Sequence, residues 1–158
     1  MATPTTKRLL EWTARDLMTR HLLMVPQEMQ IQGAARMLSR AQVTGAPVVD
    51  EQGKCVGVVS ATDFLHLVEQ DELPLRHREE IEAEGDANPQ IPTVREVMTR
   101  DPVMVEERTP IARLAKMMLD ARIHRAIVAD AQQRPVGIVT TTDILAALSR
   151  ADSGDGAA

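Results

Sequence analysis

The feature that most constrains the fold of this chain is an internal repeat with a fixed offset. When the chain is shifted by 80 positions, residues 15–69 align with residues 95–149 without a gap. The stretch RDLMTR then matches REVMTR, and GVVSATDFL matches GIVTTTDIL. About a third of the aligned positions are identical, and many others exchange one aliphatic residue for another. A constant register over this length predicts two copies of one structural unit.

Each repeat is predicted to fold as β-α-β-β-α. A short extended segment precedes apolar residues with helical spacing. Two short β-branched runs follow, APVVD and CVGVVS in the first repeat and RAIVAD and PVGIVT in the second, with polar turns between them. A last helix is expected at about 62–70 and 142–150. In the second repeat, Thr109 is the predicted N-cap of the first helix, with Pro110 at its first helical position.

The repeat pattern also predicts the division of the chain. The two repeats are expected at 13–70 and 93–150. The segment 71–92 between them is strongly charged and holds three prolines, which predicts a solvated linker with one short helix at about 75–84. The C-terminal tail 151–158 is expected to be disordered.

Composition argues against several function classes. The net charge is −5, and Trp12 and Phe64 are the only aromatic side chains, so neither a basic field nor base stacking favours nucleic acid. Cys55 is the single cysteine, which rules out an internal disulfide and predicts a buried small side chain. The histidines lack metal-ligand spacing, and no apolar run approaches the ~20 residues of a membrane-spanning helix. We therefore expect a cytoplasmic protein without a metal site or a membrane or nucleic-acid partner.

A cluster of hydroxyls and a carboxylate ends the second β-branched run of each repeat. In the second repeat, Thr140 is expected to close the strand, Thr142 to start the helix and Asp143 to lie in its first turn. These are the residue types of a helix N-cap. They also suit a nucleotide, because a carboxylate accepts hydrogen bonds from both ribose hydroxyls and a helix N-terminus attracts phosphate. Capping and binding are compatible, and the occurrence of the cluster in both repeats favours binding.

Two such units, opening near MTR and closing with Gly-aliphatic-aliphatic-Ser/Thr-x-Thr-Asp, resemble a pair of cystathionine-β-synthase (CBS) domains, or Bateman module. The motifs VREVMTRDPVMV, HRAIVAD and GIVTTTDIL carry the likeness, which covers roughly residues 13–150. The resemblance implies an α/β (α+β) fold with two repeats packed about a pseudo-twofold axis, sheets inside and helices outside. It also implies clefts that take AMP, ADP, ATP, S-adenosylmethionine or relatives, and a homodimer.

The resemblance assigns the main ligand site to the second repeat. Asp143 is expected to bind ribose, with Thr140 and Thr142 near the phosphate. The pair His124-Arg125 is expected to supply positive charge to the phosphate. The expected walls of the adenine slot are Val103, Met104, Val105, Ala126 and Ile138.

The first repeat is expected to hold a weaker or empty site. Thr44 and Gly45 stand where the second repeat has His124 and Arg125, so the phosphate would find no cation there. The expected residues of this second site are Asp63, Ser60, Thr62, Leu23, Met24, Gly45 and Ala46.

The sequence thus predicts a stand-alone regulatory module that binds an adenine nucleotide or adenosyl ligand and requires no cofactor. A ligand-independent dimerisation or assembly module is the alternative, and the protein partner is unknown. Enzymatic activity is not expected, because no base accompanies Cys55 in the sequence and no metal-ligand spacing is present.

Overall fold

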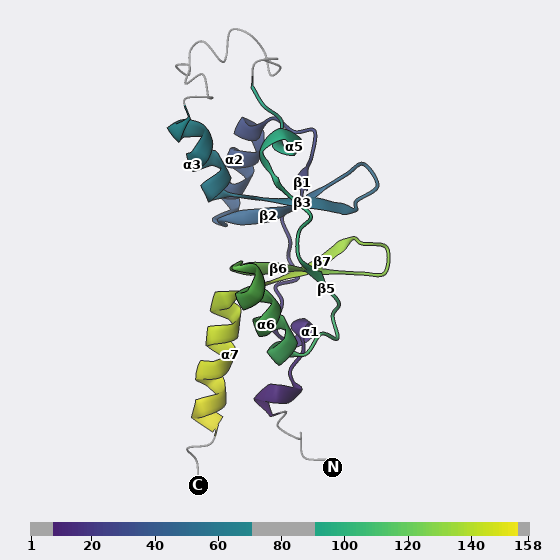
Figure 1. The fold of residues 1–158 in the computed structure, drawn as a ribbon, viewed down its shortest axis with the longest axis vertical. Coiled ribbons are helices and arrows are strands. Elements are labelled where there is room, and N and C mark those ends of the chain that lie inside the picture. The colour runs from purple at the N-terminus through teal and green to yellow at the C-terminus, as the bar shows by residue number, and fades with distance from the viewer. Residues whose placement is uncertain (1–7, 71–90, 155–158) are drawn as a thin grey trace. The chain divides into compact units, whose positions relative to one another are not determined.

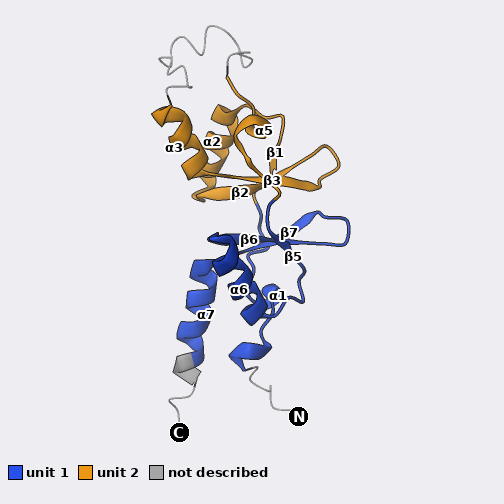
Figure 2. Cartoon of the chain, viewed as in Figure 1, with its two compact units in different colours: residues 1–22, 102–158 blue, residues 23–101 orange. Residues whose placement is uncertain are grey.

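The computed structural model describes residues 8–70 and 91–154, which form two compact units (Figures 1 and 2). Unit 1 comprises residues 1–22 and 102–158, and unit 2 comprises residues 23–101. The linker helix expected at 75–84 and the end of the tail, 155–158, lie outside the described residues.

The described part of unit 2, residues 23–70 and 91–101, contains a four-stranded sheet and three helices (Figure 1). The strand order is β1-β2-β3-β4, in which β1 is parallel to β2 and the other neighbours are antiparallel. The strands are β1 (Val25–Pro26), β2 (Gly45–Val49), β3 (Cys55–Ser60) and β4 (Thr99–Arg100), and the helices are α2 (Ile31–Ala41), α3 (Ala61–Glu69) and α5 (Val94–Val97).

Unit 1 repeats this arrangement with a three-stranded sheet in the order β5-β6-β7. Its strands are β5 (Met104–Val105), β6 (Arg125–Ala129) and β7 (Pro135–Thr140), and its helices are a 3-10 helix (Leu9–Glu11), α1 (Ala14–Leu17), α6 (Ile111–Ala121) and α7 (Thr141–Gly154). The predicted β-α-β-β-α order and the α+β fold class are therefore confirmed.

Each unit has its own apolar core between its sheet and its helices. In unit 1, Leu114 and Met118 of α6 are buried against Ala126 and Val128 of β6 and Val139 of β7. This cluster follows from helical spacing on α6 and from alternation on the strands, which turns every second residue toward the helices. The core of unit 2 is built the same way.

The opening segments of the two repeats, residues 13–22 and 93–101, which we call the first and the second lead-in, are exchanged between the units. The N–H of Ala14 donates to the carbonyl of Thr109, and Thr19 forms an antiparallel bridge with Ile138 of β7. The first lead-in therefore completes the unit that contains the second repeat. The second lead-in reciprocates, because Val94 donates to the carbonyl of Met29 and β4 pairs with β3.

Two expected helix boundaries were wrong. Pro110 is the N-cap of α6, with extended backbone (ψ 146), and the helix begins at Ile111. The exchanged segment explains this, because Pro110 is held in a bridge to Thr13. The helix α7 continues to Gly154 instead of ending at about 150, so residues 151–154 of the expected tail are helical. No proline or glycine interrupts this helix before Gly154.

Candidate functional site

The hydroxyl and carboxylate cluster of the second repeat forms a capping box at the start of α7. The N–H of Thr140 donates to Oδ2 of Asp143 at 2.8 Å, and the N–H of Asp143 donates to Oγ1 of Thr140 at 3.2 Å. Asp143 is half-buried and Thr142 is exposed. The first repeat has the corresponding bond, 2.7 Å from the N–H of Ser60 to Oδ2 of Asp63. The capping interpretation is therefore confirmed in both repeats.

The cap leaves part of each carboxylate available. Within residues 8–70 and 91–154, the hydrogen bond that Asp143 accepts in the cap goes to its Oδ2 atom. The Oδ1 atom is not used by the cap. The capping box fixes the direction of this carboxylate at the end of β7. Asp143 can therefore cap α7 and accept hydrogen bonds from a ligand at the same time.

Arg125 lies beside this cluster. It is the first residue of β6 and pairs directly with Thr140, the last residue of β7. The pairing continues into the helix, because the N–H of Thr141 donates to the carbonyl of His124 at 2.9 Å. The structure thus brings Arg125, Thr140 and Asp143 together at one end of the sheet.

The sheet separates two residues that are adjacent in the sequence. Residues paired across an antiparallel ladder share a face, so Arg125 and Ile127 lie on the same face as Thr140 and Ile138. Alternation places His124 and Ala126 on the opposite face, toward α6 and α7. The pairs expected to act together, His124 with Arg125 and Ala126 with Ile138, therefore do not share a face.

The segment expected to line the adenine base, Val103 to Val105, runs along the edge of β6 that does not pair with β7. The N–H of Ile127 donates to the carbonyl of Val103 at 3.1 Å, and Met104 pairs with Ile127. Val103 and Met104 are half-buried, whereas Val105 and Ala126 belong to the buried core. Val103 and Met104 thus lie beside the first half of β6 and keep some exposed surface there, whereas Val105 and Ala126 do not.

The corresponding end of unit 2 has the same backbone with different side chains. Gly45 pairs with Ser60, and the N–H of Ala61 donates to the carbonyl of Thr44 at 2.9 Å. Thr62 and Met24 are exposed, Leu23 is half-buried, and Ala46 belongs to the core. No cation stands at position 44 or 45, so this end lacks the charge that Arg125 supplies in unit 1.

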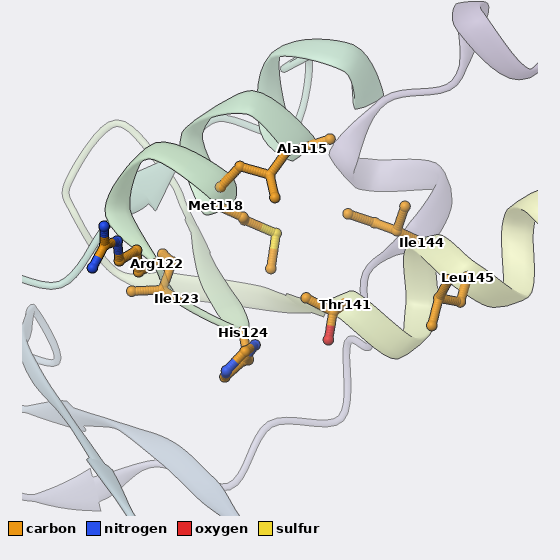
Figure 3. A pocket seen from close by; sticks show the side chains of 9 residues that line it. Ala115, Met118, Arg122, Ile123, His124, Thr141, Ile144 and Leu145 are labelled. Carbon is orange, nitrogen blue, oxygen red and sulfur yellow. The ribbon is translucent and has the colours of Figure 1, made fainter.

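A groove between α6 and α7 was not expected from the sequence (Figure 3). His124 is the one residue of the predicted main site that lines it. The exposed Leu119 and Leu145 on these helices are the signal that points to such a surface.

Among residues 8–70 and 91–154, no group of three or more His, Cys, Asp or Glu side chains is arranged to hold a metal ion. None of the helices described is long and apolar enough to cross a membrane.

Comparison with known proteins identifies the repeats. The family model of the CBS domain matches residues 14–70 and again residues 94–150. A relative, L-aspartate semialdehyde sulfurtransferase of Methanocaldococcus jannaschii, is 27% identical over 130 residues, which cover 82% of this chain. The chain spans only 22% of the length of that protein.

Two solved structures resemble most of the chain. The CBS domain pair of protein MJ0100, in complex with 5′-methylthioadenosine and S-adenosyl-L-methionine, has a TM-score of 0.71 at 26% identity and covers 86% of this chain and 98% of its own. CBSX2 of Arabidopsis thaliana in complex with AMP has a TM-score of 0.71 at 26% identity, with coverages of 89% and 98%.

Proposed function

The chain belongs to the CBS domain family, and we propose that it is a regulatory module that binds an adenine nucleotide or adenosyl ligand at the end of β6 and β7. The observation that carries the proposal is the convergence of Arg125, Thr140 and Asp143 at this end of the sheet. The ligands of the two similar structures, AMP in one and S-adenosylmethionine with methylthioadenosine in the other, support this ligand class.

Each part of the ligand has a proposed partner in unit 1. Oδ1 of Asp143 accepts hydrogen bonds from the ribose hydroxyls. Arg125 binds phosphate, because a guanidinium is always charged and can donate two parallel hydrogen bonds. The hydroxyls of Thr140 and Thr142 lie near the phosphate. The base contacts Val103, Met104 and Ile138, while His124 supports the site through its carbonyl bond to Thr141.

The corresponding end of unit 2 is proposed to bind ligands without phosphate, more weakly. Asp63 is held by Ser60 as Asp143 is held by Thr140, so the ribose contact is the same. The absence of a cation at positions 44 and 45 removes the phosphate contact. Adenosine or methylthioadenosine suits this end better than AMP or ATP.

Calorimetry with the full chain and AMP, ADP, ATP and S-adenosylmethionine tests the proposal. Asp143→Ala is expected to weaken the tightest of these by roughly 10–100-fold, since a hydrogen bond to a charged group contributes about 1.5–3 kcal/mol. Asp16→Ala is the matched control, because Asp16 accepts from the N–H of Thr13 at 2.9 Å in the same kind of capping box. Absence of binding at millimolar ligand, or equal affinity for Asp143→Ala and the parent, would refute the ribose contact.

A second candidate function, assembly without a ligand, is favoured by exposed apolar residues on α3. Leu65 and Val68 are 67% and 51% exposed and lie one turn apart on this helix. We propose that this face contributes to a homodimer. Light scattering with and without AMP separates the candidates, because a dimer whose mass and stability ignore nucleotide favours assembly. The absence of enzymatic activity and the cytoplasmic location stay predictions.

A further inference from the structure

The buried cores of the two units differ in side-chain size at two corresponding positions among the described residues. Residues whose numbers differ by 80 correspond in the two repeats. Met118 corresponds to Leu38, and the two side chains have similar volumes. The identical core residues are Val105, Ala126, Val128 and Val139 in unit 1 and Val25, Ala46, Val48 and Val59 in unit 2. The difference in size therefore lies at positions 14 and 94 of the lead-ins and at positions 114 and 34 of the helices.

At these positions the side-chain sizes change in opposite directions. Unit 1 combines the small Ala14 of the first lead-in with the large Leu114 of α6. Unit 2 combines the larger Val94 of the second lead-in with the small Ala34 of α2. All four residues are 0% exposed, so each lies within the packed core of its unit. Each core thus holds one small and one larger side chain at these positions, as close packing of two otherwise similar cores requires.

Both lead-ins enter their cores in the same way. The N–H of Ala14 donates to the carbonyl of Thr109 at 2.9 Å. The N–H of Val94 donates to the carbonyl of the corresponding residue, Met29, at 2.8 Å. Ala14 and Val94 each begin a four-residue helix and are its buried residue. A lead-in docked on the other unit would therefore place its own residue at the same point of that core.

The alternative arrangement, with each lead-in docked on the repeat to which it belongs, would mismatch both cores. Ala14 beside Ala34 would leave a cavity, because neither side chain fills the space that Val94 occupies. Val94 beside Leu114 would overfill the other core and force side chains out of their preferred rotamers. Cavities and overpacking both destabilise a closely packed interior. The exchanged arrangement avoids both faults at once.

The contacts that the two lead-ins share do not distinguish between the units. A Cβ built on Gly137 meets Met18, and a Cβ built on Gly57 meets Met98. Because the residue types are the same, a lead-in on the wrong unit would keep this contact. The choice between the units therefore depends on a buried position at which the lead-ins differ.

We propose that the sizes of Ala14 and Val94 determine which lead-in docks on which unit. Together with Leu114 and Ala34 they form a size lock, which admits the exchanged arrangement and excludes the one in which each lead-in packs on its own repeat. The size lock uses neither the capping boxes of α3 and α7 nor Arg125. It stands independently of the proposed nucleotide site.

Urea unfolding of full-length variants tests the size lock within unit 1. Ala14→Val should lower the unfolding midpoint by about 0.5–1.5 M, and Leu114→Ala should lower it by about 1–2.5 M. The double variant carries the residue pair of unit 2, so Ala14→Val should lower the midpoint less than half as much in the Leu114→Ala background. Val94→Ala combined with Leu114→Ala is the matched control, because these residues belong to different cores and their effects should add. Equal effects of Ala14→Val in the two backgrounds overturn the proposal.

Two larger variants test the choice of lead-in itself. The lead-in variant, Ala14→Val with Val94→Ala, should either lower the midpoint by about 1 M or more or move each lead-in to its own repeat. Methyl NMR separates these results, because a nuclear Overhauser contact of residue 14 with residue 114 marks the exchanged arrangement and a contact with residue 34 marks the other. Adding Ala34→Leu and Leu114→Ala gives a four-residue variant, whose midpoint should return to within about 0.5 M of the parent with the contact to residue 114 kept.

The outcomes separate a size lock from cores that are merely well filled. A lost midpoint or a changed contact in the lead-in variant, with recovery in the four-residue variant, supports the proposal. A lead-in variant that keeps both the midpoint of the parent and the contact between residues 14 and 114 overturns it. A four-residue variant that stays more than about 0.5 M below the parent, or does not fold, also overturns it.

Discussion

We expect Gly137→Ala to destabilise the protein, because the exchanged first lead-in lies directly on this glycine. A Cβ built on Gly137 lies 2.8 Å from Cγ and 2.9 Å from Cβ of Met18, and Sδ of Met18 is nearer still. Heavy atoms in real proteins essentially never approach a Cβ atom within 3.0 Å. Because the Cβ of Met18 is attached to the backbone, a change of rotamer cannot relieve all three contacts. The lead-in itself has to move.

The magnitude follows from two opposing effects. Overpacking of this kind costs about 1–3 kcal/mol. Replacing glycine by alanine inside a strand raises the free energy of unfolding by about 0.5–1 kcal/mol, because alanine has less conformational freedom in the unfolded chain. Three contacts below 3.0 Å place the overpacking cost in the upper half of its range, at about 2–3 kcal/mol, so the expected net loss is about 1–2.5 kcal/mol. With a urea dependence of about 2 kcal/mol per molar, the unfolding midpoint should fall by about 0.5–1.25 M.

Urea unfolding followed by circular dichroism measures this loss, with Gly33→Ala as the control. A Cβ on Gly33, in α2, lies 3.2 Å from Cγ and Sδ of the flexible Met29 side chain. Alanine is favoured over glycine in a helix by about 0.8–1 kcal/mol, so the same substitution should raise the midpoint or leave it unchanged. A Gly137→Ala midpoint at or above that of the parent would contradict the packing of Met18 on β7.

A double-mutant cycle shows whether Met18 is the cause. Met18→Ala removes the Cγ and Sδ atoms that crowd the new methyl group. Gly137→Ala should therefore cost less in a Met18→Ala background, with a coupling free energy of about 0.5–3 kcal/mol. Zero coupling refutes the contact between the first lead-in and the second repeat.

Two other predictions concern the charge at the site and the buried thiol. Arg125→Gly, which places the residue of position 45, should weaken AMP binding about tenfold or more and leave adenosine binding unchanged; equal losses in calorimetry refute a phosphate contact. Burial raises the pKa of the Cys55 thiol, against a smaller opposing effect of its hydrogen bond to the carbonyl of Gly57. The folded state then keeps this proton at a pH where the unfolded state has lost it, so stability is complete below the ordinary thiol pKa and declines as pH rises through it. Urea midpoints at about pH 8 and pH 10 should fall more for the parent than for Cys55→Ala, and identical falls argue against a buried thiol.

The sequence was sufficient to predict the elements of each unit but not the exchange of the lead-ins. Helical spacing and β-branched runs are local signals, and they located α2, α6 and the strands. The contact between Met18 and Gly137 is long-range. Met98 is the counterpart of Met18 in the second repeat, and it packs on Gly57 as Met18 packs on Gly137. The sequence therefore contains two equivalent methionines and two equivalent glycines. Nothing in the repeat pattern decides which methionine packs on which glycine.

The two repeats also show which residues of the candidate site the fold itself requires and which it does not. Asp143 and Asp63 occur in both repeats and both close a capping box, so the fold alone accounts for their presence. Arg125 pairs with Thr140, and Gly45 pairs with Ser60 in the same register. The shared backbone thus forms with either arginine or glycine at this position. A residue that the shared backbone does not require, placed beside a carboxylate that the cap holds in direction, is the more specific mark of a phosphate-bearing ligand. Under the proposed function, Arg125 is therefore expected to discriminate between ligands at the two ends, and Asp143 and Asp63 are expected to make the contact that both ends share.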